Sequence, residues 1–413
     1  MDGSGQPVVI HGIRGYLAPT ETFVGNQITT LKRYRPVVLC HHRSDNREFD
    51  ITPMYVIDEN EKGIRRAVGE IAYWRLRRLT HHEVVAAAEW VDGFNPALFH
   101  FHFGVDAAFF TRIHKRAGIP AVVSLYGYDV SAFPKMYGGI GRRYLKRTFN
   151  AMDCFLAMSE DMKHDAVALG IPEEKIVIHY HGINVTRFLF EQRTYNRKQI
   201  FNILCVGTLE AKKGQHHLIR SFAELRRQRP DIDARLTLVG RGPMLDECMR
   251  LAQESNVQDR VNFAGYVPHL DPKLLEYYRN ADVFVHFSTK QSCGDKEGIP
   301  GTIVEAMASG LPVVTTRHAG IPEIIYDGIQ GILLDEKDVA GITRSLLALY
   351  DDEDMCKRLG QEASYRALRE LDVQAKTRNL ERIYEKVVET ARSRNGGKQL
   401  SRNTFPTKQR VKR

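Results

Sequence analysis

The sequence has few of the features that mark secreted, membrane-spanning or metal-binding proteins. Its 413 residues include only six cysteines, and none of them forms a C-x-x-C pair. This spacing argues against a disulfide framework and a cysteine zinc site, and it indicates a reducing compartment. No apolar run approaches the roughly 18 residues that a membrane-spanning helix needs. The start, MDGSGQPVVIHG, lacks the basic and long apolar regions of a signal peptide, so we expect a cytoplasmic protein.

The excess of positive charge is concentrated at the C-terminal end of the chain. The formal net charge is +9, and residues 391–413 contain eight Lys or Arg and no acid, which leaves 9 − 8 = +1 for the rest. A nearly neutral body argues against nucleic acid as a partner. We expect residues 392–413 to be disordered. This basic tail is either a solvated extension or an electrostatic tether to an anionic membrane surface.

Short apolar segments alternate with helical stretches along most of the chain. In the first half these segments are 8–12, 35–40, 97–104, 120–127, 154–159 and 175–182. The second series consists of 200–207, 234–240, 260–267, 281–288, 311–316 and 331–334. Strands that are apolar on both faces and alternate with helices are typical of parallel sheets with helices on each side. The sequence therefore predicts an α/β protein with two doubly wound, Rossmann-like domains that face a cleft.

The same rhythm sets the predicted domain boundaries. We place the first domain at 1–182 and the second at 200–351, joined by a linker at 183–199. The charged helical stretch 352–391 is expected to cross back to the first domain. In such pairs of domains a ligand binds at the carboxyl ends of the strands, so the functional residues should lie directly after strands.

Two lysines follow the first strand of the second domain. Lys212 and Lys213 stand directly before Gly214 and the start of a helix. A helix N-terminus attracts anions, and a lysine beside it suits a phosphate. The alternative is a pair of surface lysines in an ordinary loop. The next strand is followed by VGRGP (239–243), whose glycines let the backbone approach a ligand closely, although the third glycine of a dinucleotide fingerprint is missing.

The stretch GDKEGIPGTIVEAMASGLPVV (294–314) places two carboxylates, Glu297 and Glu305, in an otherwise apolar segment. We predict a loop, then a helix that ends at Gly310, with Glu305 in its first turn and Val304, Met307 and Ala308 on its buried face. The amides of Gly301, Thr302 and Ile303 would remain free for a diphosphate, while the carboxylates accept hydrogen bonds from hydroxyl groups. This combination suits a sugar nucleotide. Alternatively, Glu305 only stabilises the helix start and Glu297 is a solvated loop acid.

Two other groups of residues have patterns that suggest a function. His100 and His102 alternate in one strand, and we predict no metal cluster among the histidines; His102, nearer the strand end, is expected in the cleft. The segments 65–82, with Tyr73 and Trp74, and 141–149 are basic and aromatic. They either cover the first sheet or lie on an anionic bilayer, and the second case makes a lipid-linked acceptor plausible.

KEGIPGTIVEAMASGLPVV resembles the E-x7-E signature of retaining glycosyltransferase family 4, which has the two-domain GT-B fold. VGTLEAKKGQHHLI, GRGP and HAGIPEIIYDGIQGILL resemble its neighbouring motifs in the same order, as does SEDMKHDAVALGIPEEKIVIHYHGINVTRF near the domain junction. In the first domain, PTETFVGNQITTL, HFHFG and SLYGYDVS look like the branch that builds exopolysaccharides, capsules and colanic-acid-type polymers. The resemblance covers residues 8–335.

The resemblance implies a retaining hexosyltransferase that moves a sugar from a UDP- or GDP-sugar to a hydroxyl acceptor, such as a saccharide or a lipid-linked oligosaccharide. Glu305 would bind the ribose, Glu297 would lie against the donor sugar, and Lys213 with the amides at 301–303 would hold the diphosphate. The other residues that it places around the donor are Gly207, Thr208, Lys212, Gly240, Gly242, Tyr266 and Val267. Those that it places near the acceptor or the reacting atoms are Glu21, Thr22, His102, Tyr126 and Asp129.

The sequence departs from this family at two positions. Thr208 stands where the family usually has an arginine that contacts phosphate, and Tyr126 stands where a histidine commonly touches the donor sugar. No cofactor or metal is expected, because fixed amides and Lys213 can stabilise the leaving diphosphate and no D-x-D pair follows a strand. Two alternatives stay open: a sugar-nucleotide epimerase on the same fold, and a non-catalytic sugar-nucleotide binder.

Overall fold

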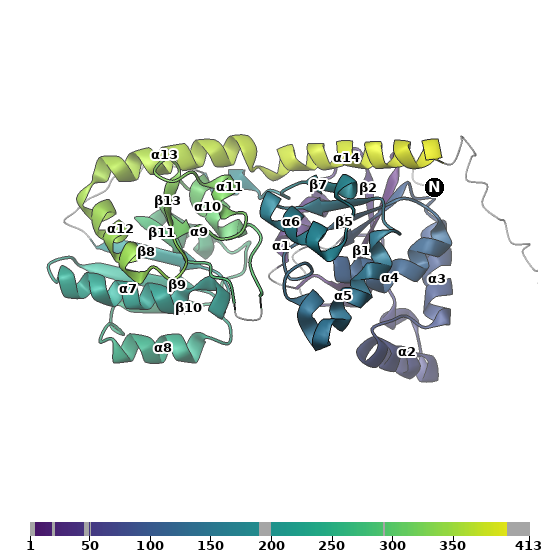
Figure 1. Cartoon of the computed structure of the whole chain (residues 1–413), viewed down its shortest axis with the longest axis horizontal. Helices are drawn as coiled ribbons and strands as arrows, with labels where there is room; N and C mark the ends of the chain where they lie inside the picture. The colour runs from purple at the N-terminus through teal and green to yellow at the C-terminus, as the bar shows by residue number, and fades with distance from the viewer. Residues whose placement is uncertain are drawn as a thin grey trace, which may run out of the picture.

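The computed structural model describes residues 5–18, 21–44, 49, 51–189, 200–291 and 294–394, without the side chain of Tyr137. In these ranges the chain forms two lobes, each built on a parallel sheet (Figure 1). The first sheet has seven strands in the order β3-β2-β1-β4-β5-β6-β7, and the second has six in the order β10-β9-β8-β11-β12-β13. The predicted fold class, two doubly wound parallel-sheet domains, is confirmed.

The first lobe contains the strands β1 (Val8–Tyr16), β2 (Arg35–Arg43), β3 (Met54–Val56), β4 (Leu98–His102), β5 (Ala121–Ser124), β6 (Cys154–Ala157) and β7 (Ile176–Ile178). Its helices are α1 (Thr22–Thr29), α2 (Gly63–Leu76), α3 (His81–Asp92), α4 (Gly104–Ala117), α5 (Met136–Phe149) and α6 (Glu160–Leu169). Every apolar segment predicted as a strand here forms one. The sequence analysis missed β3, because its three residues are too short to form an apolar run.

The second lobe contains the strands β8 (Phe201–Val206), β9 (Ala234–Val239), β10 (Val261–Gly265), β11 (Val283–His286), β12 (Val313–Thr316) and β13 (Gly331–Leu334). Its helices are α7 (Gln215–Gln228), α8 (Leu245–Glu254), α9 (Pro272–Asn280), α10 (Gly301–Ala308), α11 (Ile321–Ile324) and α12 (Val339–Asp351). The helices α13 (Glu353–Glu370) and α14 (Val373–Arg394) follow.

The order of strands determines where a ligand can bind. In the first sheet the order reverses between β1 and β4, and in the second sheet it reverses between β8 and β11. Loops that leave adjacent strands in opposite directions open a crevice at the carboxyl edge of a parallel sheet. The loops after β8 and β11 carry Lys213 and Glu297, so the topology brings these two side chains to the same edge.

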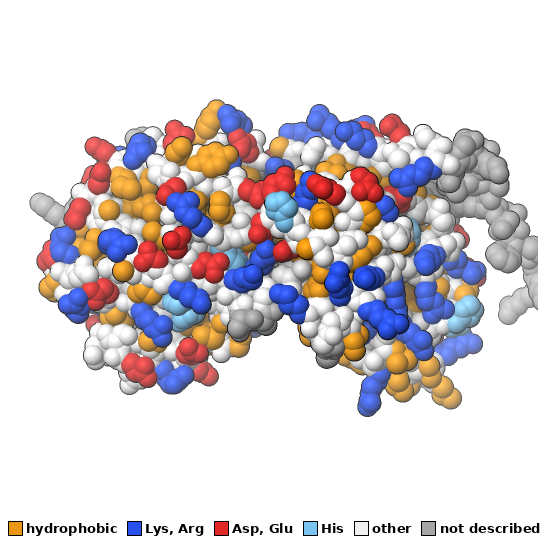
Figure 2. All heavy atoms as spheres, in the orientation of Figure 1, with side chains coloured by type: hydrophobic (Ala, Val, Ile, Leu, Met, Phe, Trp, Pro, Cys, Tyr) orange, Lys and Arg blue, Asp and Glu red, His pale blue; other side chains and the backbone are white. Residues whose placement is uncertain are grey.

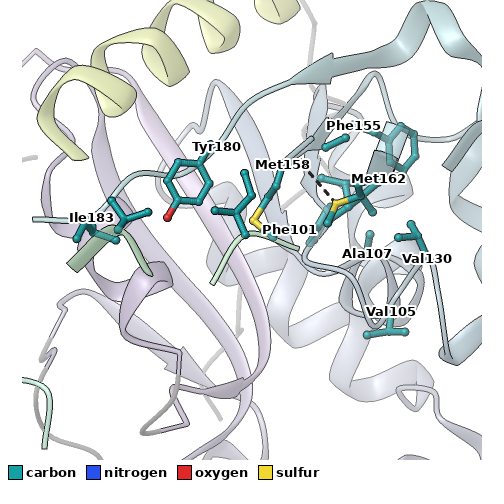
Figure 3. Close-up of a cluster of buried hydrophobic side chains, with 14 of the residues drawn as sticks. Phe101, Val105, Ala107, Val130, Phe155, Met158, Met162, Tyr180 and Ile183 are labelled. Carbon is teal, nitrogen blue, oxygen red and sulfur yellow. Dashed lines mark hydrogen bonds between the residues drawn. The ribbon is translucent and has the colours of Figure 1, made fainter. Parts of the chain in front are cut away.

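The two lobes share a continuous apolar contact. Phe101, Phe155 and Met158 of the first lobe belong to the same buried cluster as Ile183 at the lobe junction and residues of α10 (Figure 3). The loop of Gly298 presses on this cluster: a Cβ at that position would lie 2.0 Å from Cε of Met158. The end of the Met158 side chain would have to move to admit a Cβ here, so the missing side chain of Gly298 lets the loop that carries Glu297 pack closely on the first lobe.

The last two helices connect the lobes a second time. In Figure 1, α13 lies along the second lobe, and α14 continues along the first. The Glu381 carboxylate of α14 accepts hydrogen bonds from the backbone N–H groups of Lys32 (2.7 Å) and Arg33 (2.6 Å). These contacts hold α14 against the first lobe.

Three other expectations fall partly outside the described residues. Residues 190–199 of the linker, Cys293 and residues 395–413 of the tail lie outside them. The start of the linker is packed rather than open, since Ile183, Val185 and Phe188 are buried. The five described cysteines are buried and free. In the described part of the chain, no helix combines the length and the hydropathy needed to span a membrane.

Candidate active site

A cavity of about 850 Å³ lies between the two lobes, at the carboxyl edges of both sheets. Most of the residues singled out from the sequence line it. They are Thr22, Tyr126, Gly207, Thr208, Lys213, Gly240, Gly242, Tyr266, Val267, Glu297, Gly301, Thr302 and Glu305. The volume is in the upper part of the range of about 300–1,000 Å³ that is usual for small-molecule sites.

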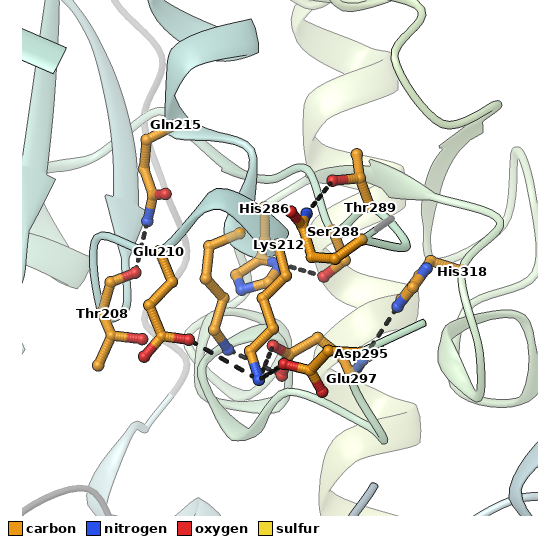
Figure 4. A network of polar contacts seen from close by, with 12 residues as sticks. Thr208, Glu210, Lys212, Gln215, His286, Ser288, Thr289, Asp295, Glu297 and His318 are labelled. Atoms are coloured by element: carbon orange, nitrogen blue, oxygen red, sulfur yellow. Dashed lines mark hydrogen bonds and ion pairs between the residues drawn. The ribbon is translucent and has the colours of Figure 1, made fainter. Parts of the chain in front are cut away.

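Glu297 and two lysines form an ion-pair network on one side of this cavity (Figure 4). Lys213 Nζ lies 2.9 Å from Glu297 Oε2, and Lys212 Nζ lies 3.6 Å from Glu297 Oε1. Lys212 also pairs with Asp295 at 3.0 Å and does not line the cavity. Its position therefore differs from the one predicted for a residue that contacts the donor. Lys213 is therefore the ammonium group of this network that faces the cavity.

The charge state of Glu297 follows from this network. Burial alone would raise its pKa, but Lys213 and Lys212 outweigh burial and lower the pKa of Glu297 to about 2. Since two opposite charges within about 4 Å favour the ionised form, the carboxylate stays charged at neutral pH. A second anion that approaches Lys213 would share its charge with Glu297.

A histidine that the sequence analysis gave no role holds the backbone of Glu297. The Glu297 N–H donates to His318 Nε2 at 3.1 Å, which requires that this nitrogen carries no proton. His318 Nδ1 therefore carries the proton and donates it to Glu336 at 2.6 Å. This series of hydrogen bonds, from Glu336 through His318 to the Glu297 backbone, fixes the loop that carries the candidate catalytic residue Glu297.

Glu305 lies on the other side of the same cavity. It accepts a hydrogen bond from the Tyr278 hydroxyl at 2.7 Å, and His269 Nε2 lies 3.4 Å from its second oxygen. The prediction that Glu305 belongs to the first helical turn was wrong: α10 begins at Gly301, and its first turn has no acidic residue. A tyrosine hydroxyl, rather than the helix end, holds this carboxylate in place.

The start of α10 also differs from the prediction in two ways. The Ile303 N–H donates to the Pro300 carbonyl at 3.1 Å and is not available to a diphosphate, so the amides of Gly301 and Thr302 remain as candidates. All residues from Ile303 to Ala308 are buried, not only one face. The cause is the position of α10 between the second sheet, α13 and the first lobe.

The glycines of VGRGP allow two loops to cross at the edge of the cavity. A Cβ at Gly240 would lie 1.9 Å from the Gly207 carbonyl oxygen, and Gly240 has φ of +147°. Any side chain here would separate the loops after β8 and β9. Gly207 and Gly240 both line the cavity, so a ligand meets backbone rather than side chains at this point.

Three residues predicted in the first-lobe part of the cleft do not line this cavity. His102 is fully buried and contacts the cavity only through Tyr126, whose hydroxyl lies 2.9 Å from His102 Nδ1. Asp129 is also buried, and its carboxylate accepts hydrogen bonds from the N–H groups of Gly104, Tyr126 and Gly127. It shapes the loop that carries Tyr126. Glu21 lines a separate cavity in the first lobe.

His102 is part of a histidine cluster that the sequence analysis did not foresee. His11, His100 and His102 present ring nitrogens within 4.8 Å of one another, all buried. His11 Nδ1 and His102 Nε2 share a hydrogen bond of 3.0 Å, and His100 bonds Tyr384 (2.6 Å) and Ser124 (2.8 Å). Burial lowers the pKa of all three. Five of their six ring nitrogens pair with protein groups, and His11 Nε2 has no hydrogen-bond partner among the described residues, so the arrangement is mainly a hydrogen-bonded core.

Comparisons with known proteins agree with this arrangement. Residues 187–366 match the family described as Glycosyl transferases group 1, and residues 21–187 match the one described as Glycosyltransferase Family 4. An amylovoran biosynthesis glycosyltransferase from Erwinia amylovora is 30% identical over 63% of this chain and 63% of its own length. A GDP-mannose-dependent alpha-(1-6)-phosphatidylinositol monomannoside mannosyltransferase from Mycolicibacterium smegmatis is 30% identical over 64% of this chain and 71% of its own.

A solved structure shares the whole architecture. The crystal structure of HepE from Anabaena, in complex with UDP and glucose, matches with a TM-score of 0.73 over 92% of this chain and 99% of that one. The sequence identity is 17%, so this likeness concerns the fold.

Proposed function

The chain belongs to glycosyltransferase family 4, with the two-domain GT-B fold, and from this we infer that it moves a sugar from a nucleotide-diphosphate sugar to a hydroxyl acceptor. The observation that carries the proposal is the placement of Lys213, Glu297 and Glu305 around one interlobe cavity. The relative that serves amylovoran biosynthesis supports a role in surface polysaccharide synthesis.

The proposed chemistry follows from the opposite charges that Lys213 and Glu297 bring to one side of the cavity. Breaking the bond between the anomeric carbon and the phosphate oxygen leaves positive charge on the sugar ring and negative charge on the diphosphate. Lys213 and the amides at the start of α10 would stabilise the diphosphate, and Glu297 would stabilise the developing cation. The acceptor oxygen would form its bond to the anomeric carbon on the same face, and its proton would pass to the leaving phosphate oxygen.

The residues of the site support a donor held without a metal or cofactor. Lys213 and the helix start supply positive charge where the diphosphate would lie, while Glu305 would accept hydrogen bonds from the ribose hydroxyls. The base stays open: HepE is in complex with UDP, and the mycobacterial relative is GDP-mannose-dependent. Tyr266 and Val267, after β10, would line the base pocket.

A thermal-shift screen of UDP-, GDP- and ADP-sugars tests this proposal. We expect one nucleotide series to raise the melting temperature, because a ligand present at 100 times its Kd stabilises the folded state by about 2.7 kcal/mol. Turnover of the stabilising sugar nucleotide is then followed by chromatography with and without EDTA.

The products of that reaction separate the three functions. Free nucleoside diphosphate, formed by transfer or slow hydrolysis and insensitive to EDTA, supports the glycosyltransferase. An epimerised sugar nucleotide would support the epimerase, and binding without turnover would support the non-catalytic binder. If no sugar nucleotide stabilises the protein, the proposal fails.

We also propose that the enzyme associates peripherally with an anionic membrane on the cytoplasmic side and uses a lipid-linked acceptor. Only Gly69 and Ala72 of α2 are buried, whereas Ile71 is 61% and Trp74 77% exposed. Figure 2 shows apolar side chains at the lower right, where Figure 1 places α2, with basic side chains beside them. An exposed apolar stripe flanked by cations fits the interface of an anionic bilayer.

Vesicle flotation tests the membrane proposal. We expect the full chain to float with phosphatidylcholine–phosphatidylglycerol vesicles and not with phosphatidylcholine alone. The double variant Ile71→Ser and Trp74→Ser should bind these vesicles at least about tenfold more weakly. A tenfold loss of affinity corresponds to about 1.4 kcal/mol, which is less than the burial of one such side chain contributes.

A matched control changes exposed apolar residues on the other lobe. Tyr365 and Leu368 of α13 are 59% and 45% exposed, so Tyr365→Ser with Leu368→Ser should leave flotation unchanged. Equal loss in both double variants, or equal binding to both kinds of vesicle, would contradict a specific role for α2.

A further inference from the structure

The loop that carries Glu297 is attached to both lobes. Lys213 of the second lobe pairs with Glu297 itself. The preceding residue, Lys296, pairs with the first lobe instead: its Nζ lies 2.5 Å from Asp161 Oδ2 and 2.7 Å from Asp165 Oδ2, both on α6. Two neighbouring side chains of one loop therefore contact opposite lobes.

Lys296 is largely withdrawn from solvent. Its side chain is 14% exposed, and those of Asp161 and Asp165 are 40% and 32% exposed. Burial alone would lower the pKa of Lys296, but the two carboxylates outweigh burial and raise it, so the ammonium group stays charged at neutral pH. Lys296 does not line the interlobe cavity. Any effect of Lys296 on the reaction would therefore act through the loop rather than by contact with a ligand.

The start of α6 contacts the second lobe at a further point. Figure 1 shows α6 on the side of the first lobe that faces the second. The Glu160 N–H, in the first turn of α6, donates to Glu323 Oε1 of α11 at 2.8 Å, and a carboxylate at a helix N-terminus is favourable. A Cβ at Gly320, directly before α11, would lie 2.7 Å from Cβ of Ser159, the N-cap residue of α6. The second lobe thus holds the helix to which Lys296 is paired.

The backbone of the Glu297 loop also contacts the first lobe. A Cβ at Gly127, which has φ of +116°, would lie 3.1 Å from the Lys296 carbonyl oxygen and 3.5 Å from the Gly298 nitrogen. Gly127 follows Tyr126, which lines the interlobe cavity. The loop of Glu297 therefore lies directly against the loop that brings Tyr126 to the same cavity.

We propose that Lys296, Asp161 and Asp165 are positioning residues, which attach the Glu297 loop to the first lobe and so fix the Glu297 carboxylate relative to both lobes. This inference rests on the proposed glycosyltransferase function, in which Glu297 lies against the donor sugar. The donor would be held mainly by the second lobe, whereas Tyr126 belongs to the first. A displacement of about 1 Å at a reacting group can reduce a rate by about 10²-fold, so the attachment would matter for turnover.

Hydrogen-exchange mass spectrometry tests this attachment without any substrate. We expect residues 294–299 to exchange at least about threefold faster in Lys296→Met than in wild type, because the loop loses its contact with α6. Lys296→Arg keeps the charge and should exchange as wild type does. A matched control, Lys163→Met, removes an ion pair of α6 with Glu173 that stays within the first lobe, and it should leave residues 294–299 unchanged.

Kinetics separate a positioning role from a direct contact with the donor. Lys296→Met should reduce kcat about 10–100-fold and change the affinity for the nucleoside diphosphate less than about twofold. The variant Asp161→Asn with Asp165→Asn should show the same split, and it provides the test on its own if Lys296→Met does not fold. Adding Lys296→Met to this variant should reduce kcat no further, because the three residues act as one unit.

Three results would overturn the positioning role. They are unchanged exchange of residues 294–299 in Lys296→Met, losses of kcat that multiply in the triple variant, and a loss of nucleotide affinity as large as the loss of kcat. If wild type neither binds nor turns over any sugar nucleotide, the proposed function fails instead. Faster exchange in Lys296→Met alone would then still support the attachment of the loop to α6.

Discussion

Replacing Lys213 with alanine should reduce turnover of the donor by about 10²–10³-fold, the usual loss when one preorganised charge-stabilising group is removed. Lys213 is the ammonium group that lines the interlobe cavity, and it lies 2.9 Å from Glu297. Without it, a departing diphosphate would meet the Glu297 carboxylate and only the helix start. The measurement is kcat/KM for release of nucleoside diphosphate, together with the melting temperature of the variant.

Two further variants show whether the charge itself causes this loss. Lys212→Ala removes a neighbouring ammonium group that pairs with Asp295 outside the cavity, and it should reduce turnover less than tenfold. Lys213→Ala with Glu297→Gln removes the carboxylate that would otherwise be left with Lys212 as its partner. Because Glu297→Gln alone should lose turnover, the comparison is made on affinity for the nucleoside diphosphate. If this double variant binds it as tightly as wild type does, Lys213 acts only by neutralising Glu297, and its proposed contact with the diphosphate is refuted.

The sequence was sufficient for the two sheets and for one edge of the site. Strands buried on both faces give apolar runs that alternate with helices, and this pattern requires no knowledge of distant contacts. Lys213 and Glu297 were found in the same way, because each follows a strand and the topology of a parallel sheet brings such loops together. The structure places the two side chains in direct contact.

The partners of these residues could not be found from local pattern. Tyr278 approaches Glu305 across 27 positions of sequence, and His318 approaches the Glu297 backbone across 21. Each lies on a separate element, so only the packing of α9 and the loop after β12 creates the contact. The histidine in the HAGIP stretch was visible as part of a family-like motif, but nothing local identified its partner.

Two residues at the carboxyl edge of the first sheet were predicted to line the cavity but do not. His102 and Asp129 both follow or end strands of the first sheet, yet both are fully buried. A position at the carboxyl edge does not reveal whether a side chain points into the cavity or beneath the loop that forms it. Here Tyr126 occupies the surface, and the two predicted residues support it from below.

Glu305→Ala should weaken binding of the nucleoside diphosphate by about 10–100-fold, because a hydrogen bond to a charged group contributes about 1.5–3 kcal/mol. Glu305 lines the cavity and is held by Tyr278, a buried hydroxyl whose pKa is raised by burial and by Glu305 and which therefore stays a donor. Calorimetric titration with UDP and GDP measures the effect. Glu297→Gln, which leaves this side of the cavity intact, should retain most of the affinity and lose turnover.

The variant Tyr278→Phe tests whether the Glu305 carboxylate must be held in one orientation to bind the ribose, or whether its negative charge alone is enough. The variant keeps the ring that packs in the core and removes only the hydroxyl that donates to Glu305 Oε2 at 2.7 Å. If Glu305 must be oriented by Tyr278 to accept hydrogen bonds from both ribose hydroxyls, the affinity of the variant for the nucleoside diphosphate should fall about tenfold. A 2′,3′-dideoxy nucleotide, which lacks these hydroxyls, should bind wild type and variant equally. Unchanged affinity of Glu305→Ala for the ribonucleotide would show that the ribose lies elsewhere, and the proposed orientation of the donor would then be wrong.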